Sequence, residues 1–173
     1  MHGTLKYITL GAIMIICQIL LSEYVNIWPV LYIAIFPQFI ILLPPTMNRF
    51  LHLLIAFILG LGIDILCDGV AGLNAGALVA MAYVRPLVLK ITIPKASFDI
   101  YENAPLIPRT LDLPKLALIY ALMLTVFFTV YMLLDSAASF TFGYTMLKLA
   151  VCIIANSIIA LLCNIALLDK ILR

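Results

Sequence analysis

A single carboxylate, Asp64, lies inside the apolar run from Phe50 to Cys67. Runs of about 20 apolar residues cross a bilayer as helices, because a helix satisfies its own backbone hydrogen bonds where water is absent. The chain contains several such runs, and 10% of its residues are charged, against about 25% in ordinary soluble domains. The sequence therefore predicts an all-α, polytopic membrane protein with a single transmembrane domain over residues 1–173.

Six spans are predicted from the apolar runs between punctuating residues. They cover residues 5–21, 28–43, 50–67, 73–84 with an extension to 93, 116–134 and 144–168. Pro37 is expected to kink the second span, because it leaves the carbonyl of Ile33 without a helical donor. Arg85 and Pro86 are expected to shorten or tilt the fourth. Residues 94–114 contain four prolines and are predicted to form a cytoplasmic loop, either a contact segment for a partner or a stiff connector.

The basic residues predict an orientation. With the N-terminus in the cytoplasm, nine of the ten Lys and Arg residues fall at or near the cytoplasmic side, and Lys148 lies toward the outside. This distribution follows the positive-inside rule, so both termini are expected in the cytoplasm. The net charge of +2 is explained by this bias, and no basic cluster indicates nucleic-acid binding.

Residue types that bind metals or perform catalysis are sparse. The four cysteines lie within spans without CxxC spacing, and the histidines are His2 and His52, so no metal or cofactor is expected. Intramembrane aspartyl proteases carry Gly-x-Gly-Asp and Tyr-Asp motifs. Here the spacing is Gly-x-Gly-x-Asp, no Tyr-Asp pair occurs, and Asp64 and Asp68 share one helix face. The sequence therefore predicts no enzyme.

Glycines gather around Asp64. Five of the eight lie within 60–76: Gly60, Gly62, Gly69, Gly72 and Gly76. The spacing of Gly72 and Gly76 allows two helix backbones to approach closely. A tight outer hairpin between the third and fourth spans is predicted, with Asn74 capping the fourth helix or bonding across the interface.

Asp64 needs a partner, because a charge at the helix centre costs roughly 2.5 to 3.5 kcal/mol to insert. Lys148 is predicted at a matching depth in the sixth span and is the candidate for an ion pair. Asp68, Asn74 and Arg85 complete the intramembrane polar candidates. An ion pair would keep Asp64 charged, whereas burial without a partner would favour the neutral acid. The sequence leaves both states open.

Several features together resemble the MreD family of bacterial rod shape-determining proteins. They are the six spans, the sequence GLGIDILCDG at 60–69, the turn GLNA at 72–75, and Arg85-Pro86 in the fourth span. The Pro94-Lys95 loop with YEN at 101–103 is similar to the Bacteroidetes branch of that family.

The resemblance implies a non-enzymatic scaffold of the cell-elongation machinery in the bacterial inner membrane. Members of the family associate with MreC, a single-span protein, and through it with the RodA glycosyltransferase, a class B penicillin-binding protein and the MreB filament. The family also resembles the substrate-binding subunits of energy-coupling-factor transporters. That likeness gives an alternative, a small-solute-binding subunit with pocket anchors at Asp64, Asn74, Lys148 and Asn156. In either role the chain is surrounded by membrane lipid. The sequence leaves open whether it forms a homodimer.

Overall fold

The computed structural model describes residues 2–24, 31–44, 47–93, 111–135 and 142–168, and the regular secondary structure in these ranges is helical, with no strand. The helices are α1 (His2–Tyr24), α2 (Pro37–Leu42), α3 (Arg49–Ile63), α4 (Leu73–Thr92), α6 (Leu113–Asp135) and α7 (Phe142–Cys163). Two π-helical turns, η1 (Asp64–Asp68) and η3 (Asn164–Leu168), extend α3 and α7. Five of the described helices are long and apolar enough to cross a membrane: α1, α3 with η1, α4, α6, and α7 with η3. The predicted all-α class is thus confirmed for the described residues, with five helices that could cross a membrane.

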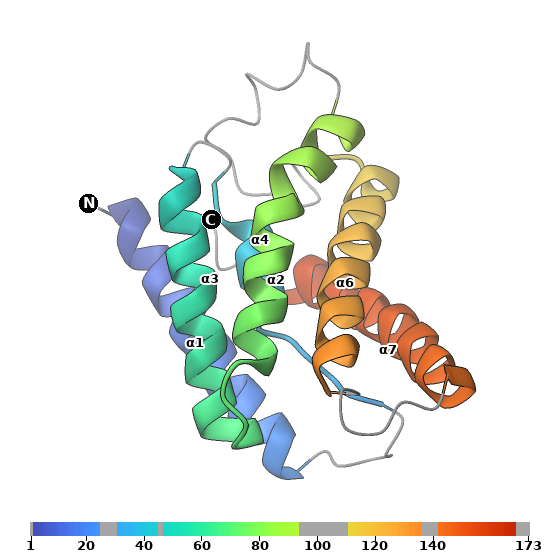
Figure 1. Cartoon of the computed structure of the whole chain (residues 1–173). Helices are drawn as coiled ribbons and strands as arrows, with labels where there is room; N and C mark the ends of the chain where they lie inside the picture. The colour runs from blue at the N-terminus through green and yellow to red at the C-terminus, as the bar shows by residue number, and fades with distance from the viewer. Residues whose placement is uncertain (1, 25–30, 45–46, 94–110, 136–141, 169–173) are drawn as a thin grey trace.

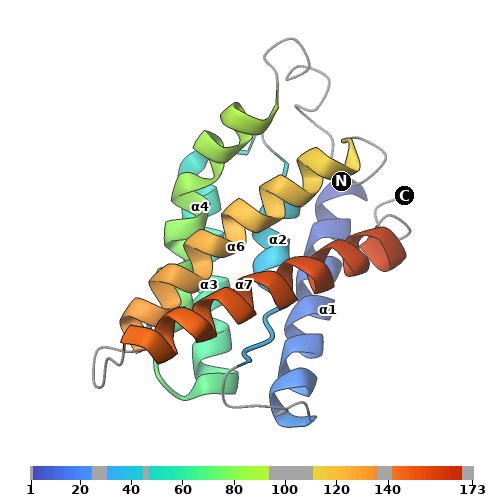
Figure 2. The ribbon, with the colours of Figure 1, turned by 90° about the vertical axis from the view of Figure 1, so that its right-hand side faces the viewer.

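Helix α4 is central to the bundle. Its most extensive contacts are with α6 and α3, and α7 packs on α6. Half of the spanning window is buried in α4 and in α6, whereas the share falls to 22% in α1 and α7. Helices α1 and α7 therefore lie at the periphery and leave most of their surface uncovered (Figures 1 and 2).

Aromatic side chains fill the centre of the bundle. Phe36, Phe127 and Phe128 are fully buried. Phe127 meets Phe36 and Phe128 edge to face, with ring centroids 5.6 and 5.2 Å apart. These geometries suit the quadrupoles of the rings and anchor the chain just before α2 against α6.

The predicted second span is wrong in its secondary structure. Residues 31–35 have no regular secondary structure, and we call them the extended segment; the helix that follows, α2, has six residues, all buried. Pro37 occupies the first turn of α2 instead of kinking a longer helix. That position suits proline, because the first N–H groups of a helix have no intrahelical acceptor in any case. Residues 28–30 of the predicted span lie outside the described residues.

Helix α4 covers the predicted fourth span, 73–84, and nearly all of its predicted extension to 93, and it is not shortened at Arg85 and Pro86. Helix α4 continues through Arg85 and Pro86 to Thr92. Proline removes the hydrogen bond to the carbonyl of Ala82, which bends a helix without ending it when neighbours hold both halves. Figure 1 shows the last turns of α4 leaning away from the earlier ones. Of the predicted loop, 94–110 lie outside the described residues.

Candidate functional site

Asp64 is fully buried where the third span meets the fourth. Its Oδ1 accepts hydrogen bonds from the backbone N of Asn74 (2.8 Å) and from its Nδ2 (2.9 Å). Its Oδ2 accepts from the backbone N of Gly72 (2.8 Å) and of Ala75 (3.2 Å). The carboxylate therefore faces four donor atoms, three of them belonging to the start of α4.

This arrangement makes Asp64 the N-terminal cap of the next helix. The N-cap position of α4 is Gly72, which has no side chain to bond the first N–H groups. Asp64 supplies that function from the preceding helix, and its negative charge also lies at the positive end of the α4 dipole. Four donors suit the ionised carboxylate, which is a pure acceptor. The cost of burying the charge is offset by bonds that α4 needs anyway.

Gly60 brings the two helices close enough for this contact. A Cβ added at Gly60 would lie 2.5 Å from the Cα of Ala75 and 2.6 Å from its backbone N. Real Cβ atoms do not approach backbone so closely, so the first turn of α4 rests directly on the α3 backbone. Asp64 is one turn further along the same helix, within reach of the α4 N–H groups.

The predicted small-residue seam through Gly72 and Gly76 is corrected by the structure. Gly72 has φ +107° and Gly69 has φ +69°, so both serve the turn between η1 and α4. A Cβ added at Gly76 would lie 3.1 Å from a side-chain carbon of Leu134 on α6, whereas one added at Gly62 would meet open space. The close approach of two helix backbones is at Gly60. The sequence predicted all five glycines of 60–76 as packing positions and did not single out Gly60.

Lys148 does not bind Asp64, and the predicted ion pair is wrong. Its Nζ lies 3.4 Å from Oδ2 of Asp135, at the end of α6, and both side chains are partly exposed. Matched depth along two spans did not bring the groups together, because the start of α4 lies next to Asp64 and saturates its oxygens. The side chain of Asp68 is outside what the structure describes.

Asn74 extends the Asp64 contact into a network. Its Oδ1 lies 3.5 Å from the hydroxyl of Tyr32, in the extended segment before α2. The Tyr32 ring stacks on Tyr131 of α6 with centroids 5.0 Å apart. The backbone carbonyl of Tyr32 in turn accepts from Nδ2 of Asn156 on α7 at 2.7 Å. One chain of polar contacts thus joins the third span, α4, the extended segment and α7.

Asn156 binds the extended segment as a neighbouring strand would. Its Nδ2 donates to the carbonyl of Tyr32, and its Oδ1 accepts from the backbone N of Ala34 at 2.8 Å. The Sγ of Cys152, one turn earlier on α7, lies 3.4 Å from the backbone N of Tyr32. Non-helical backbone at membrane depth is tolerated where protein groups satisfy it, and these two side chains do so from one side.

Gln18 of α1 does the same from the other side. Its Nε2 donates to the carbonyl of Ile33 at 3.0 Å, and its Oε1 accepts from the backbone N of Ile35 at 2.9 Å. The side chain is 2% exposed. Sequence reasoning missed Gln18, although two signals were available: an amide inside an apolar run, and the carbonyl of Ile33 that Pro37 leaves without a helical donor.

Arg85 binds the C-terminal end of α2. Its Nη2 donates to the carbonyls of Ile41 (3.1 Å) and Leu43, and its Nη1 donates to Nε2 of His52 at 2.9 Å. Arg85 and His52 are both buried. The guanidinium caps a short helix whose last carbonyls have no continuation, which a cation at a helix C-terminus does favourably.

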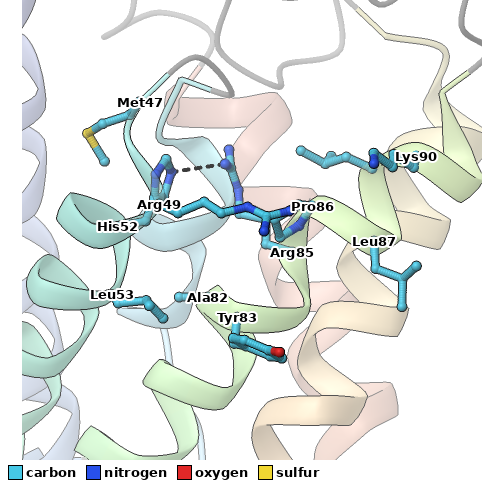
Figure 3. Close-up of a pocket in the computed structure, with 11 residues that line it drawn as sticks. Met47, Arg49, His52, Leu53, Ala82, Tyr83, Arg85, Pro86, Leu87 and Lys90 are labelled. Carbon is cyan, nitrogen blue, oxygen red and sulfur yellow. Dashed lines mark hydrogen bonds between the residues drawn. The ribbon is translucent and has the colours of Figure 1, made fainter.

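A pocket of about 430 Å³ opens beside Arg85, between the start of α3 and the last turns of α4 (Figure 3). We call it the basic pocket. Its lining consists of Met47, Arg49, His52, Leu53, Ala82, Tyr83, Arg85, Pro86, Leu87, Leu89 and Lys90. None of the anchors predicted for a solute pocket is among them. Within the described parts of the chain, no cluster of His, Cys, Asp or Glu could hold a metal ion.

No protein-family model, curated protein or solved structure matches this chain. The function is therefore inferred from the residues and their geometry.

Proposed function

We propose that this protein is a non-enzymatic scaffold of the MreD type in the bacterial inner membrane. In this role it binds an MreC-like single-span protein and, through it, a RodA glycosyltransferase with a class B penicillin-binding protein and, indirectly, MreB. The observation that carries the proposal is the coordination of Asp64. The one carboxylate buried at membrane depth in the described chain is saturated by the start of the next helix, an arrangement that supports a structural role over proton transfer or hydrolysis.

The other buried polar groups support the same proposal. Gln18 and Asn156 bond the backbone of the extended segment, and Arg85 bonds the end of α2. These polar residues fix the second span, which consists of the extended segment and the short helix α2. They thereby make the bundle rigid, as a scaffold requires. In this topology the chain crosses six times, the second crossing being residues 31–43, and both termini lie in the cytoplasm.

The peripheral helices provide the surface for the partner. Helix α7 exposes a row of large apolar residues along the membrane: Leu147, Ile154, Ile158, Leu162 and Ile165. Their spacing follows one helix face, and an uncovered apolar face of this kind can pack against a partner helix as well as against lipid. A single-span protein such as an MreC-like partner offers one such helix.

The proposal is tested by photo-crosslinking in native membranes. A photoreactive residue is introduced at Ile158, which is 54% exposed on α7, and the matched control carries it at Met123, which is fully buried in α6. We expect a crosslink from position 158 to a bitopic cell-shape protein that co-purifies with the chain, and no crosslink from position 123. Co-purification of an ATPase pair or a bound vitamin would overturn the scaffold proposal in favour of a transporter subunit.

A further inference from the structure

The basic pocket holds positive charge that its lining does not neutralise. Arg49 and Arg85 carry guanidinium groups, Lys90 adds an ammonium, and none of its described lining residues is acidic. The carboxylates whose partners are described bind groups outside the pocket. Asp112, for example, forms an ion pair with Lys115. Figure 3 shows Arg49 reaching from α3 across the pocket toward the side of α4 that carries Arg85. Like charges brought together in this way are stabilised by an anion between them.

Arg85 also retains an unused donor. The residue is 4% exposed, and both of its terminal nitrogens are bonded to protein. Its Nε has no hydrogen-bond partner among the described atoms. A buried donor of a charged group is costly to leave unpaired. An oxygen atom in the pocket would provide the missing acceptor, and phosphate oxygens are the acceptors that arginine matches best.

The pocket opens toward the bilayer. Tyr83 and Leu87 lie on the outward face of α4 and are 75% and 58% exposed, although α4 is a membrane-spanning helix. Leu53 and Leu89 make the inner wall apolar. A ligand bound here would place its polar group against the basic side chains and its apolar part against the leucines. Basic pockets between spanning helices that combine these features suit the headgroups of anionic lipids.

We propose that the basic pocket binds the phosphate of an anionic membrane lipid, with the phosphate between Arg49, Lys90 and the Nε of Arg85. The lipid fills a gap between the start of α3 and the end of α4, and it anchors this end of the bundle in one leaflet. This role does not depend on the scaffold function.

Lipid binding is measured on the purified full chain by native mass spectrometry. The probes are phosphatidylglycerol and phosphatidylcholine with identical acyl chains. We expect phosphatidylglycerol to bind more tightly. Arg49→Gln combined with Lys90→Gln should weaken phosphatidylglycerol binding about 25-fold, since each basic residue near a membrane surface contributes about a factor of five. Both side chains are exposed, so the double variant is expected to unfold at the wild-type temperature without lipid.

Two controls test whether lipid binding depends on the basic pocket or only on the overall charge of the protein. Lys115→Gln removes one positive charge at the same end of the bundle, outside the pocket, and should bind phosphatidylglycerol as the wild type does. Arg49→Lys with Lys90→Arg keeps the charge and should retain binding. Equal binding of both lipids, or wild-type binding by the glutamine double variant, would overturn the proposal. Full displacement of the lipid by inorganic phosphate would also overturn it, by identifying a soluble phosphate compound as the ligand.

Discussion

Replacing Asp64 by asparagine tests whether the carboxylate caps α4. Each carboxylate oxygen accepts two hydrogen bonds. An asparagine side chain has the same shape but one oxygen, so whichever way the amide turns, two donors, at least one of them buried, lose their acceptor and face the amide N–H groups instead. Each unsatisfied donor costs about 1 to 3 kcal/mol, which gives a loss of about 2 to 6 kcal/mol in the free energy of unfolding. Hydrogen bonds between membrane helices average about 0.6 kcal/mol, so an ordinary interhelical bond would give a much smaller effect.

The loss is measured by reversible unfolding in mixed micelles, with Asp135→Asn as the matched control. Asp135 makes a partly exposed ion pair with Lys148, so the control should lose at most about 1 kcal/mol. Double-mutant cycles then identify the partner of Asp64. Asp64→Asn with Asn74→Ala should show a coupling of about 0.5 kcal/mol or more, whereas Asp64→Asn with Lys148→Met should be additive.

Two results would refute this reasoning. If Asp64→Asn lost no more stability than the Asp135 control, the hydrogen bonds to α4 would not stabilise the fold. If Asp64 and Lys148 were coupled by more than about 1 kcal/mol, the ion pair predicted from the sequence would be present after all.

The other predictions concern helix contact and the extended segment. Gly60→Ala should destabilise the protein by about 1 to 3 kcal/mol or prevent accumulation, because the new Cβ meets the backbone of Ala75; thermal unfolding in detergent measures it. Gly62→Ala, the matched control with open space around it, should leave the unfolding temperature unchanged or raise it, and equal effects of both changes would contradict the Gly60 contact. Asn156→Leu removes the hydrogen bonds that Asn156 makes to two backbone groups of 31–35 and should cost about 2 kcal/mol or more. Wild-type stability of that variant would mean that the segment finds its hydrogen bonds elsewhere.

Much of the fold follows from apolar run length. The runs that contain Phe50 and Leu116 became helices close to their predicted bounds, because a lipid environment leaves few other structures for such a run. The segment before Pro37 did not form the predicted helix, because backbone groups in a membrane can also be satisfied by side chains of neighbouring helices. Extended backbone is allowed when Gln18 and Asn156 satisfy it, and no local pattern shows that amides on two distant helices will meet there.

The candidate site divides in the same way. Insertion cost alone identified Asp64 as a residue that needs partners, and the glycines near it predicted a close contact between the third and fourth spans. The partners themselves depend on tertiary structure. The backbone N–H groups of α4 reach Asp64 because Gly60 lets the helices touch, whereas Lys148 turns to the end of α6. Depth in a membrane can be estimated from position in a span, but the direction in which a side chain points depends on which helices are neighbours.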